Sequence, residues 1–192
     1  KNLNLDHILD SNDAEKITQI IKEKESKGYA YELANSSLDL LIFRQLPNYE
    51  EKFELIDFMV IVENKRRSSL GSGWRNDGSE HPILSEATIK IKTKDEIFHT
   101  AAEGNGPVGA LDNATRKALI GTFPEINKIR LTDYIVRVVE EGTGTGAVVR
   151  VIIESSDDKE VWTTVGASSN IIEATWIALA DSIEWFLIKN SK

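Results

Sequence analysis

The sequence predicts an α+β fold in which a β-β-β-α unit occurs twice, giving an internally duplicated domain with pseudo-twofold symmetry behind a short helical subdomain. Two observations lead to this prediction. From Phe53 onward, short runs rich in Val, Ile, Thr and aromatic residues, which are typical of strands, are followed by single helical patterns. Several motifs of the first half also recur in the same order in the second half. Two three-stranded antiparallel sheets, each carrying one helix, can bury those helices by packing together.

Residues 1–50 are expected to form the helical subdomain. In "SNDAEKITQIIKEKESKG" (11–28), capping residues precede an apolar stripe and a glycine closes the segment, which predicts a helix. In "YELANSSLDLLIFRQL" (31–46), a second helix is expected before Pro47. Its inward-facing residues are expected to be Leu33, Leu38, Leu40 and Leu41. Two short helices alone make a poor core.

The remaining domain, 53–188, is expected to hold repeats at about 53–122 and about 128–188. In the first repeat the patterns predict three strands and then a helix, at 53–64, 85–94, 95–103 and about 108–120. Between the first two strands, residues 65–82 contain glycines and serines without periodicity, as expected of a mobile hairpin loop.

Four sequence matches support the duplication. They align Asp133 with Asp57, Ala147 with Ala87, Trp162 with Phe98, and the helical motif A-T-x-x-A-L at 174–179 with the one at 114–119. The order of the matches is conserved along the chain, and the spacing between them changes only at loops. A duplicated unit explains this order better than the common use of Val and Ile in strands.

The composition excludes several classes of partner. With 31 acidic and 23 basic residues, the net charge of −8 repels the phosphates of nucleic acids. No apolar run approaches the roughly 20 residues that cross a membrane, and the first residues do not resemble a secretion signal. The chain has no cysteine, which fits a reducing compartment, so the cytoplasm is the expected location. Because the sequence does not begin with Met, it is expected to be part of a longer chain.

No metal or cofactor is expected in these 192 residues. His7, His81 and His99 lie far apart and none has a second ligand at helical or hairpin spacing. The sequence also lacks a nucleophile-elbow motif and a paired histidine and acid. Catalysis by this chain alone is therefore a secondary alternative.

The segment "EGNGPVGALDNAT" (103–115) is a glycine-rich turn that leads into a helix. It lacks the lysine of a P-loop and follows an antiparallel strand, so a nucleotide is not the expected ligand. Pro107 suits the first helical position, while Gly104 and Gly106 permit close approach of a ligand or another backbone. The free N–H groups of the first turn can hold an anion, a carboxylate as well as a phosphate. The simpler alternative is a tight turn that binds nothing.

A related turn, "VGASSNIIEAT" (165–175), leads into the helix of the second repeat. The duplication therefore predicts two similar helix N-termini. They could form two comparable sites, or one composite site at a subunit interface.

Three segments, "SEATIKIKTKDEIFHTAAEGNGPVGALDNATRKAL", "LTDYIVRVVEEGTGTGAVVRVIIES" and "WTTVGASSNIIEATWIALADSIEW", resemble the C-terminal regulatory domain of the isopropylmalate synthase and citramalate synthase family. The run "HTAAEGNGPV" and the preceding "GYAYELANSSLDLLIFR" look most like the citramalate synthase branch. The resemblance implies that residues 1–50 are the linker after a catalytic TIM barrel and that 53–188 are the regulatory, dimerising domain.

The resemblance also implies the effector-binding residues. They are Gly104, Asn105, Gly106, Pro107, Val108, Asp133, Tyr134, Ala147, Val149, Ser169, Asn170, Ile171 and Ile172. One departure from the family pattern is Gly109, where relatives commonly carry Asp or Asn.

The implied function is feedback inhibition by an end-product amino acid: isoleucine in the citramalate branch, leucine in the isopropylmalate branch. The effector's carboxylate is expected at the N–H groups after Gly106, and its ammonium near Asp133, Glu103 or backbone carbonyls. The expected partners are the effector, a second copy of the chain, and the chain's own catalytic barrel, which would need a divalent metal. The linker helices, 13–46, are expected to transmit the signal.

Each of these residues also has a simpler structural interpretation. Asp133 could cap or pair at a strand end, and Tyr134, Ile171 and Ile172 could belong to the core. Trp162, Trp176 and Trp185 are assigned to the core or a dimer interface. A purely structural dimerisation domain is the third alternative.

Overall fold

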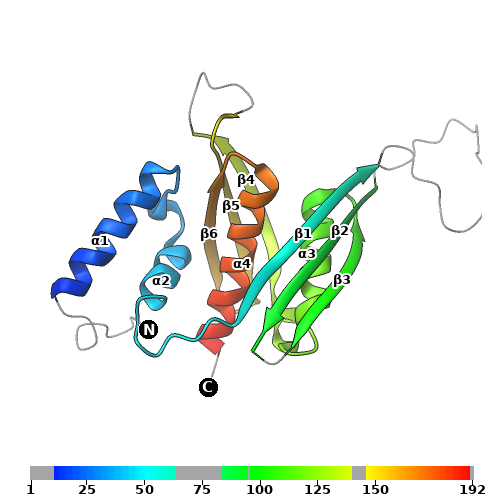
Figure 1. Ribbon diagram of the computed structural model, residues 1–192, viewed down its shortest axis with the longest axis horizontal. Helices are drawn as coiled ribbons and strands as arrows, with labels where there is room; N and C mark the ends of the chain where they lie inside the picture. The colour runs from blue at the N-terminus through cyan, green and yellow to red at the C-terminus, as the bar shows by residue number, and fades with distance from the viewer. Residues whose placement is uncertain (1–10, 64–83, 95, 140–145, 191–192) are drawn as a thin grey trace, which may run out of the picture. The chain divides into compact units, whose positions relative to one another are not determined.

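A computed structural model describes residues 11–63, 84–94, 96–139 and 146–190 (Figure 1). The predicted loop at 65–82, His7 and His81 lie outside these ranges. The helices and strands, in chain order, are α1 (Ser11–Ser26), η2 (Tyr31–Leu33), α2 (Asn35–Phe43), β1 (Phe53–Glu63), β2 (Leu84–Thr93), β3 (Ile97–Gly104), α3 (Pro107–Leu119), η3 (Pro124–Lys128), β4 (Arg130–Val138), β5 (Val149–Ser156), β6 (Val161–Ser168) and α4 (Ile171–Asn190).

The duplicated β-β-β-α architecture is confirmed. Two separate three-stranded antiparallel sheets have the orders β1-β2-β3 and β4-β5-β6, and each is followed by one helix. The chain divides into two compact units: residues 53–124 form one, and the linker segment together with the residues from 125 onward forms the other. The linker subdomain therefore packs with the second repeat. No helix in the described part of the chain is long and apolar enough to cross a membrane.

The strand register confirms the alignment of Asp133 with Asp57. Strand β1 has an irregularity between Leu55 and Asp57, and β4 has the same irregularity between Leu131 and Asp133. The matching irregularities show which residue of β4 corresponds to which residue of β1. The alignment of Trp162 with Phe98 is confirmed as well, since Trp162 lies opposite Ser155 and Phe98 lies opposite Ile91 at matching positions of the two sheets.

The predicted alignment of the middle strands is wrong by four residues. Lys90 lies opposite Asp57, and Glu154 lies opposite Asp133, so Glu154 and not Arg150 is the counterpart of Lys90. By the same register, Ala87 corresponds to Val151 instead of Ala147. A shift by an even number of residues keeps every side chain on the same face of the sheet, so the alternation of apolar residues could not reveal the error.

The helix alignment is displaced in the same way. Thr100 Oγ1 donates to the Ala114 carbonyl at 2.9 Å, and Thr164 Oγ1 donates to the Ala178 carbonyl at 2.7 Å. Ala114 therefore corresponds to Ala178, one turn after the predicted Ala174. Four residues are about one helical turn, so the two alignments place nearly the same face inward.

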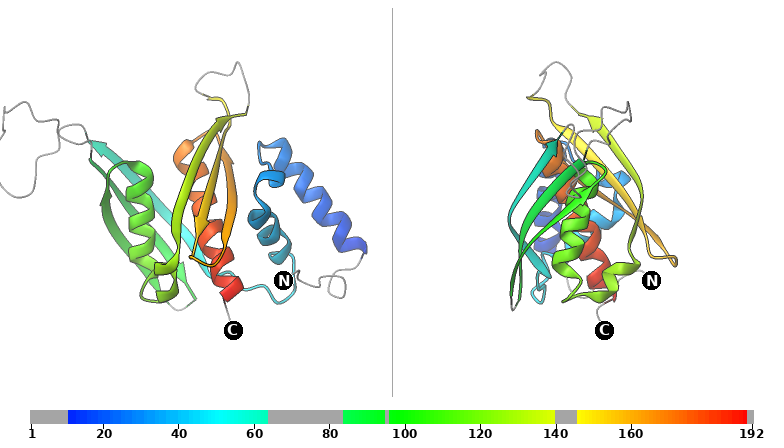
Figure 2. Two further views of the ribbon diagram at one scale, coloured as in Figure 1. Left: turned by 180° about the vertical axis from the view of Figure 1, so that it is seen from behind. Right: turned by 90° about the vertical axis from the view of Figure 1, so that its right-hand side faces the viewer.

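In the unit formed by 53–124, α3 lies along one face of the β1-β2-β3 sheet (Figure 2). Three side chains of β2, Ala87, Ile89 and Ile91, are fully buried. They alternate with residues that are half-buried or exposed, as a one-sided antiparallel sheet requires. The helix contributes small and branched residues to this layer: Ala110, Leu111, Ala114, Ala118 and Leu119.

In the other unit, α4 packs on β5 and β6, and its aromatic residues extend the core. Trp162 of β6 stacks on Trp185 and Phe186 of α4, with ring centroids 5.3 Å and 5.6 Å apart. The Trp162 indole N–H donates to Ser182 Oγ at 2.8 Å. Trp162, Trp176 and Trp185 are all buried, so their assignment to the core is confirmed.

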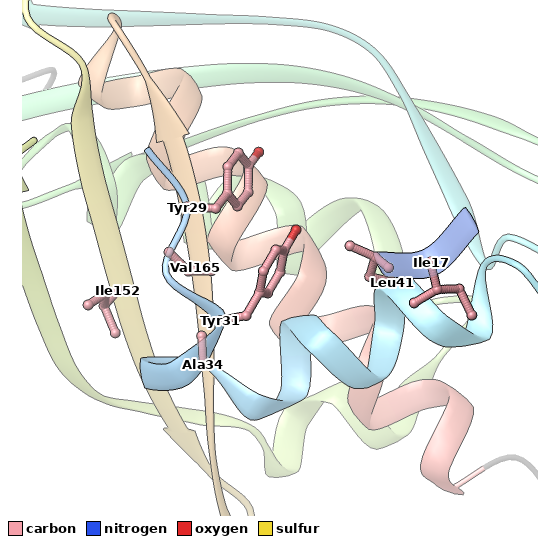
Figure 3. Close-up of a cluster of buried hydrophobic side chains, with 7 residues drawn as sticks. All are labelled: Ile17, Tyr29, Tyr31, Ala34, Leu41, Ile152 and Val165. Atoms are coloured by element: carbon pink, nitrogen blue, oxygen red, sulfur yellow. The ribbon is translucent and has the colours of Figure 1, made fainter. Parts of the chain in front are cut away.

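The linker subdomain adds a cluster of buried side chains to the same unit (Figure 3). Tyr29 and Tyr31 stack on each other with ring centroids 5.8 Å apart, and Ile152 and Val165 join the cluster from neighbouring strands. Gly28 makes the turn after α1 at φ +100°, a conformation that other residues rarely adopt. The Arg150 guanidinium donates to the Gly28 carbonyl at 2.5 Å and so ties this turn to β5.

The second linker helix is shorter than predicted. Residues 31–33 form a separate 3-10 turn, and Ala34, at φ −146°, interrupts the helix before α2 begins. The interruption rotates the turn, so Leu33 is 43% exposed and its predicted inward orientation is wrong. Leu40 and Leu41 are buried as predicted, and Leu38 packs against the linker cluster.

Candidate functional site

The N-terminus of α3 is built by the glycine-rich turn. Gly106 is the N-cap residue in extended conformation, and Pro107 occupies the first helical position, as predicted. The first helical hydrogen bond runs from the Ala110 N–H to the Gly106 carbonyl at 2.9 Å. Within the described part of the chain no side chain caps α3. The amides that follow Pro107 can therefore receive an anion.

Gly104 and Gly106 have different roles in this turn. A Cβ on Gly104 would overlap the Ala110 amide nitrogen and lie 2.8 Å from the Ala110 Cα. Gly104 is therefore required for the close approach of β3 and α3, and not for a ligand. At Gly106 and Gly109, an added Cβ would have nothing within 4 Å. These two glycines leave open space in front of the first turn of α3.

Ser85, which the sequence analysis did not name, lies beside this turn. It pairs with Gly104 across β2 and β3 and faces the α3 side of the sheet, as Ala87 does. Its Oγ is buried and has no hydrogen-bond partner among the residues that the structure describes, a combination that is rare in folded proteins. In the correct register Ser85 corresponds to Val149, a predicted effector residue, since Val149 pairs with Ser168 as Ser85 pairs with Gly104. The four-residue alignment error concealed this correspondence.

Replacing Ser85 with alanine should not destabilise the unliganded protein and should raise the free energy of unfolding by up to about 1 kcal/mol, because the substitution removes an unpaired buried hydroxyl. Urea unfolding measures this change. Ser155→Ala is the matched control: Ser155 Oγ accepts a hydrogen bond from Ser182 Oγ at 2.8 Å, and its loss should cost about 1 kcal/mol. Equal destabilisation by both substitutions would mean that Ser85 has a partner.

The N-terminus of α4 differs from that of α3 because side chains of the residues directly before α4 cap it. Asn170 Oδ1 accepts the Ile172 N–H at 2.9 Å. Ser168 Oγ accepts the Asn170 N–H at 3.0 Å and donates to the Glu173 carboxylate at 2.5 Å. A protein carboxylate thus already lies at this helix N-terminus. The two helix N-termini that the duplication predicted to be similar are therefore chemically different, and α3 has the more open one.

Tyr134 is connected to α4 through a hydroxyl chain. Its hydroxyl lies 2.6 Å from Thr175 Oγ1. Thr175 donates its single hydroxyl hydrogen to the Ile171 carbonyl at 2.7 Å, so Tyr134 is the donor to Thr175. Burial raises the pKa of Tyr134, which keeps the phenol protonated for this role. Tyr134 and Ile171, both predicted site residues, are thus linked by Thr175, which the sequence analysis did not name.

Asp133 lies on the face of the β4-β5-β6 sheet opposite to the face that carries Tyr134. It precedes Tyr134 on β4, and successive side chains of a strand project to opposite faces. Its Oδ1 accepts the Tyr134 N–H at 2.8 Å. It lines a cavity of about 180 Å³ together with Leu33, Ile135, Arg137, Ile152, Glu154 and Thr163. A small ligand in this unit cannot contact the side chains of both Asp133 and Tyr134.

The other predicted residues of this unit gather near the start of α4. Val149 is half-buried at the start of β5 and pairs with Ser168, directly before Ser169 and Asn170. Ile172 is half-buried, and Ile171 is 42% exposed. Ala147 is half-buried two residues before β5. The unit formed by 53–124 contains the other predicted group, Gly104, Asn105, Gly106, Pro107 and Val108.

Among the residues that the structure describes, no three His, Cys, Asp or Glu side chains come together as metal ligands. His99 is exposed on β3 and alternates with the residues that face α3. The candidate chemistry of the α3 N-terminus rests instead on its uncapped backbone amides.

The model of the LeuA allosteric (dimerisation) domain family matches residues 32–187. The (R)-citramalate synthase of Geobacter sulfurreducens is 44% identical over 176 residues, which cover 92% of this chain and 31% of that protein. The (R)-citramalate synthase of Aquifex aeolicus is 42% identical over 182 residues, which cover 95% and 32%. The 2-isopropylmalate synthase of Shewanella woodyi is 28% identical over 159 residues, which cover 83% and 25%.

The chain spans about a third of the length of these citramalate synthases. The family match begins in η2 and ends in α4, so it includes both repeats and the α2 part of the linker. The identity to the two citramalate synthases exceeds the identity to the 2-isopropylmalate synthase. The chain belongs to the LeuA allosteric (dimerisation) domain family.

Proposed function

We propose that this chain is the regulatory and dimerisation domain of a citramalate synthase and binds isoleucine as a feedback inhibitor. In this proposal the rest of the enzyme, a metal-dependent acyltransferase barrel, condenses acetyl-CoA with pyruvate, and the chain itself is not catalytic. The identity to citramalate synthases supports the branch. The observation that carries the binding role is the uncapped N-terminus of α3 with open space at Gly106.

The effector's carboxylate is proposed to accept hydrogen bonds from the amides of Val108 and Gly109. These amides carry the positive end of the α3 dipole, which favours an anion. The side chain of Glu103 alternates with Gly104 and so projects away from α3. The ammonium group is therefore proposed to bind backbone carbonyls near the turn. Val108, which is half-buried, would contact the branched side chain.

Isothermal titration calorimetry of the chain with isoleucine, leucine and valine tests this proposal. We expect isoleucine to bind most tightly. One methylene distinguishes valine from the other two by only about 1 to 3 kcal/mol, and pocket shape must separate isoleucine from leucine. Tighter binding of leucine would assign the chain to the 2-isopropylmalate branch instead. Absence of binding heat with all three at millimolar concentration would leave a purely structural dimerisation domain.

The substitution Gly106→Val tests the position of the carboxylate. Nothing lies within 4 Å of an added Cβ, so the fold should tolerate the valine, whereas the branched side chain would occupy the space in front of the first turn. We expect isoleucine affinity to fall at least tenfold while the dimer persists in sedimentation. Gly121→Val is the matched control, because Gly121 follows the other end of α3 and also has open space. Unchanged affinity in Gly106→Val would place the carboxylate elsewhere.

A further inference from the structure

The hydroxyl of Ser85 lies beside the first turn of α3. Ser85 is fully buried, and its Oγ has no hydrogen-bond partner within the described ranges. It pairs with Gly104, and paired side chains of an antiparallel sheet have Cβ atoms about 5 Å apart. A Cβ on Gly104 would lie 2.6 Å from the Gly109 carbonyl carbon and would overlap the Ala110 amide nitrogen. The Ser85 hydroxyl therefore lies next to the helix N-terminus whose amides no described side chain caps.

Burial of the Ser85 hydroxyl needs a compensating role. A buried hydroxyl without a hydrogen bond destabilises the fold, and an apolar side chain of similar size avoids this penalty. Native structures rarely retain such groups without a functional reason. A serine hydroxyl donates one hydrogen bond, so it can serve a ligand that brings its own acceptor. Together with the uncapped amides of α3, this donor favours an anionic ligand group.

The second repeat contains a hydroxyl that already binds such a group. Ala114 corresponds to Ala178, and counting back along both helices places Gly109 on Glu173. Glu173 lies in the first turn of α4, and its carboxylate accepts a hydrogen bond from Ser168 Oγ at 2.5 Å. A serine at the end of a strand thus holds a carboxylate at the helix N-terminus of this repeat.

The first repeat has the hydroxyl but lacks the carboxylate. In both repeats, one of the two paired strand positions next to the helix N-terminus is a serine: it is Ser85 on β2 in the first repeat and Ser168 on β6 in the second. The position of the carboxylate is occupied by Gly109, and nothing lies within 4 Å of a Cβ added there. The second repeat supplies its own carboxylate, whereas the first has space for one that comes from outside the chain.

We propose that Ser85 is a carboxylate-binding residue of the α3 site: its hydroxyl donates a hydrogen bond to the carboxylate that the Val108 and Gly109 amides also bind. The inference rests on the proposed function, because the carboxylate is that of the effector amino acid. The hydroxyl gives up no hydrogen bond to a described residue when it binds, so the new bond contributes nearly its full strength to affinity. The turn must open slightly to admit the ligand, and the open space at Gly106 permits this.

Isothermal titration calorimetry of the 192-residue chain with isoleucine tests the role of Ser85. Ser85→Ala should weaken isoleucine binding by about tenfold to a hundredfold, the range expected for loss of a hydrogen bond to a charged group. In urea unfolding without isoleucine, the same variant should be at least as stable as the natural protein. Lower affinity without lower stability distinguishes a ligand contact from a structural role. Loss of stability in this variant would overturn the proposal.

Thr115→Val is the matched control for the calorimetry. Thr115 is also fully buried, but its hydroxyl donates to the Leu111 carbonyl at 2.7 Å within α3. The valine removes this hydroxyl and keeps the shape of the side chain, and isoleucine affinity should change by less than about twofold, as for surface changes away from a site. An equal loss of affinity in Thr115→Val and Ser85→Ala would assign the effect to the packing of α3 and contradict a direct contact.

The substitution Gly109→Glu tests the comparison between the repeats without any ligand. The new side chain supplies at α3 the carboxylate that Glu173 supplies at α4, and the open space at Gly109 accommodates it. With this partner present, adding Ser85→Ala should lower the unfolding equilibrium constant's preference for the folded state by about tenfold, whereas Ser85→Ala alone should not. Gly109→Gln, which has the same shape without the charge, should make Ser85→Ala less harmful than Gly109→Glu does.

The outcomes separate this inference from the proposed function. If Ser85→Ala binds isoleucine as tightly as the natural protein does, the role of Ser85 is wrong while the proposed function stands. If Ser85→Ala changes stability equally with Gly109 and with Gly109→Glu, the hydroxyl does not meet a carboxylate at α3 and the inference also fails. If the natural chain binds none of isoleucine, leucine and valine, the proposed function fails, and the stability comparison still decides whether Ser85 can hold a carboxylate.

Discussion

Replacing Gly104 with alanine should destabilise the unit formed by 53–124 by about 3 kcal/mol or more, the upper end of the usual effect of overpacking. The new Cβ would overlap the Ala110 amide nitrogen and lie 2.6 Å from the Gly109 carbonyl carbon. These are backbone atoms in the first turn of α3, and they cannot rotate away. The helix must therefore move off the sheet. Urea unfolding followed by far-ultraviolet circular dichroism measures the loss.

Gly106→Ala is the matched control for this substitution. It lies two residues further along the same turn, in extended conformation, with nothing within 4 Å of an added Cβ. Because alanine is less favourable than glycine at an N-cap, its free energy of unfolding should fall by no more than about 1 kcal/mol. A similar loss in both variants would show that the turn, and not the approach of β3 to α3, limits stability.

Replacing Arg44 with methionine should lower the free energy of unfolding by about 3 kcal/mol at neutral pH. The substitution leaves the buried carboxylates of Asp181 and Glu184 without their cation, and breaking a buried ion pair by removing one partner costs about 3 to 5 kcal/mol. The lower value applies because Arg44 is 37% exposed and water can partly replace it. Burial alone would lower the pKa of Arg44, but the two carboxylates outweigh it and raise the pKa, so the guanidinium is charged at neutral pH.

The difference in free energy of unfolding between the natural protein and Arg44→Met should narrow as the pH falls from about 7 to about 5. Burial already raises the pKa of Asp181 above its ordinary value, and loss of the Arg44 cation raises that pKa further. A carboxyl with a raised pKa in the folded state contributes stability below its unfolded pKa, and it loses that contribution as the pH rises through the folded pKa. Lowering the pH therefore stabilises the folded state of Arg44→Met more than it stabilises the folded state of the natural protein. Urea unfolding at both pH values tests this; a deficit that widened toward pH 5 would contradict the buried-carboxylate explanation.

Lys189→Met provides the comparison on the same helix. Lys189 pairs with Glu160, and both side chains are more than a third exposed. A surface ion pair contributes about 0 to 1 kcal/mol, so this variant should lose little stability and show no comparable pH effect. A loss equal to that of Arg44→Met would mean that burial of the carboxylates is not the cause.

The β-β-β-α repeats were predictable because each depends on local patterns. Strand β2 alternates buried Ala87, Ile89 and Ile91 with half-buried or exposed residues, and Pro107 begins α3 where its missing N–H has no cost. Such patterns fix the type and order of the elements. They do not fix how one repeat aligns on the other, because a four-residue shift preserves both the strand alternation and, nearly, the helix face.

The candidate site was predictable only in part. The turn at Gly104–Val108 could be named from its glycines and its family resemblance, and α3 begins there. Ser85 could not be named, because its significance comes from its burial beside Gly104 with no hydrogen-bond partner in the described ranges. The separation of Asp133 from Tyr134 follows from strand alternation, and it became visible once β4 was placed in its sheet.

The sequence by itself determined the duplicated architecture and the resemblance to a regulatory domain, since these follow from periodicity and motif order. Only the tertiary structure decided which glycine serves packing and which leaves open space, and that preceding side chains cap α4 while none among the described residues caps α3. It also revealed that the carboxylates of α4 bind Arg44, about 140 residues earlier in the chain. Contacts between residues so distant in sequence arise from packing, which no local pattern records.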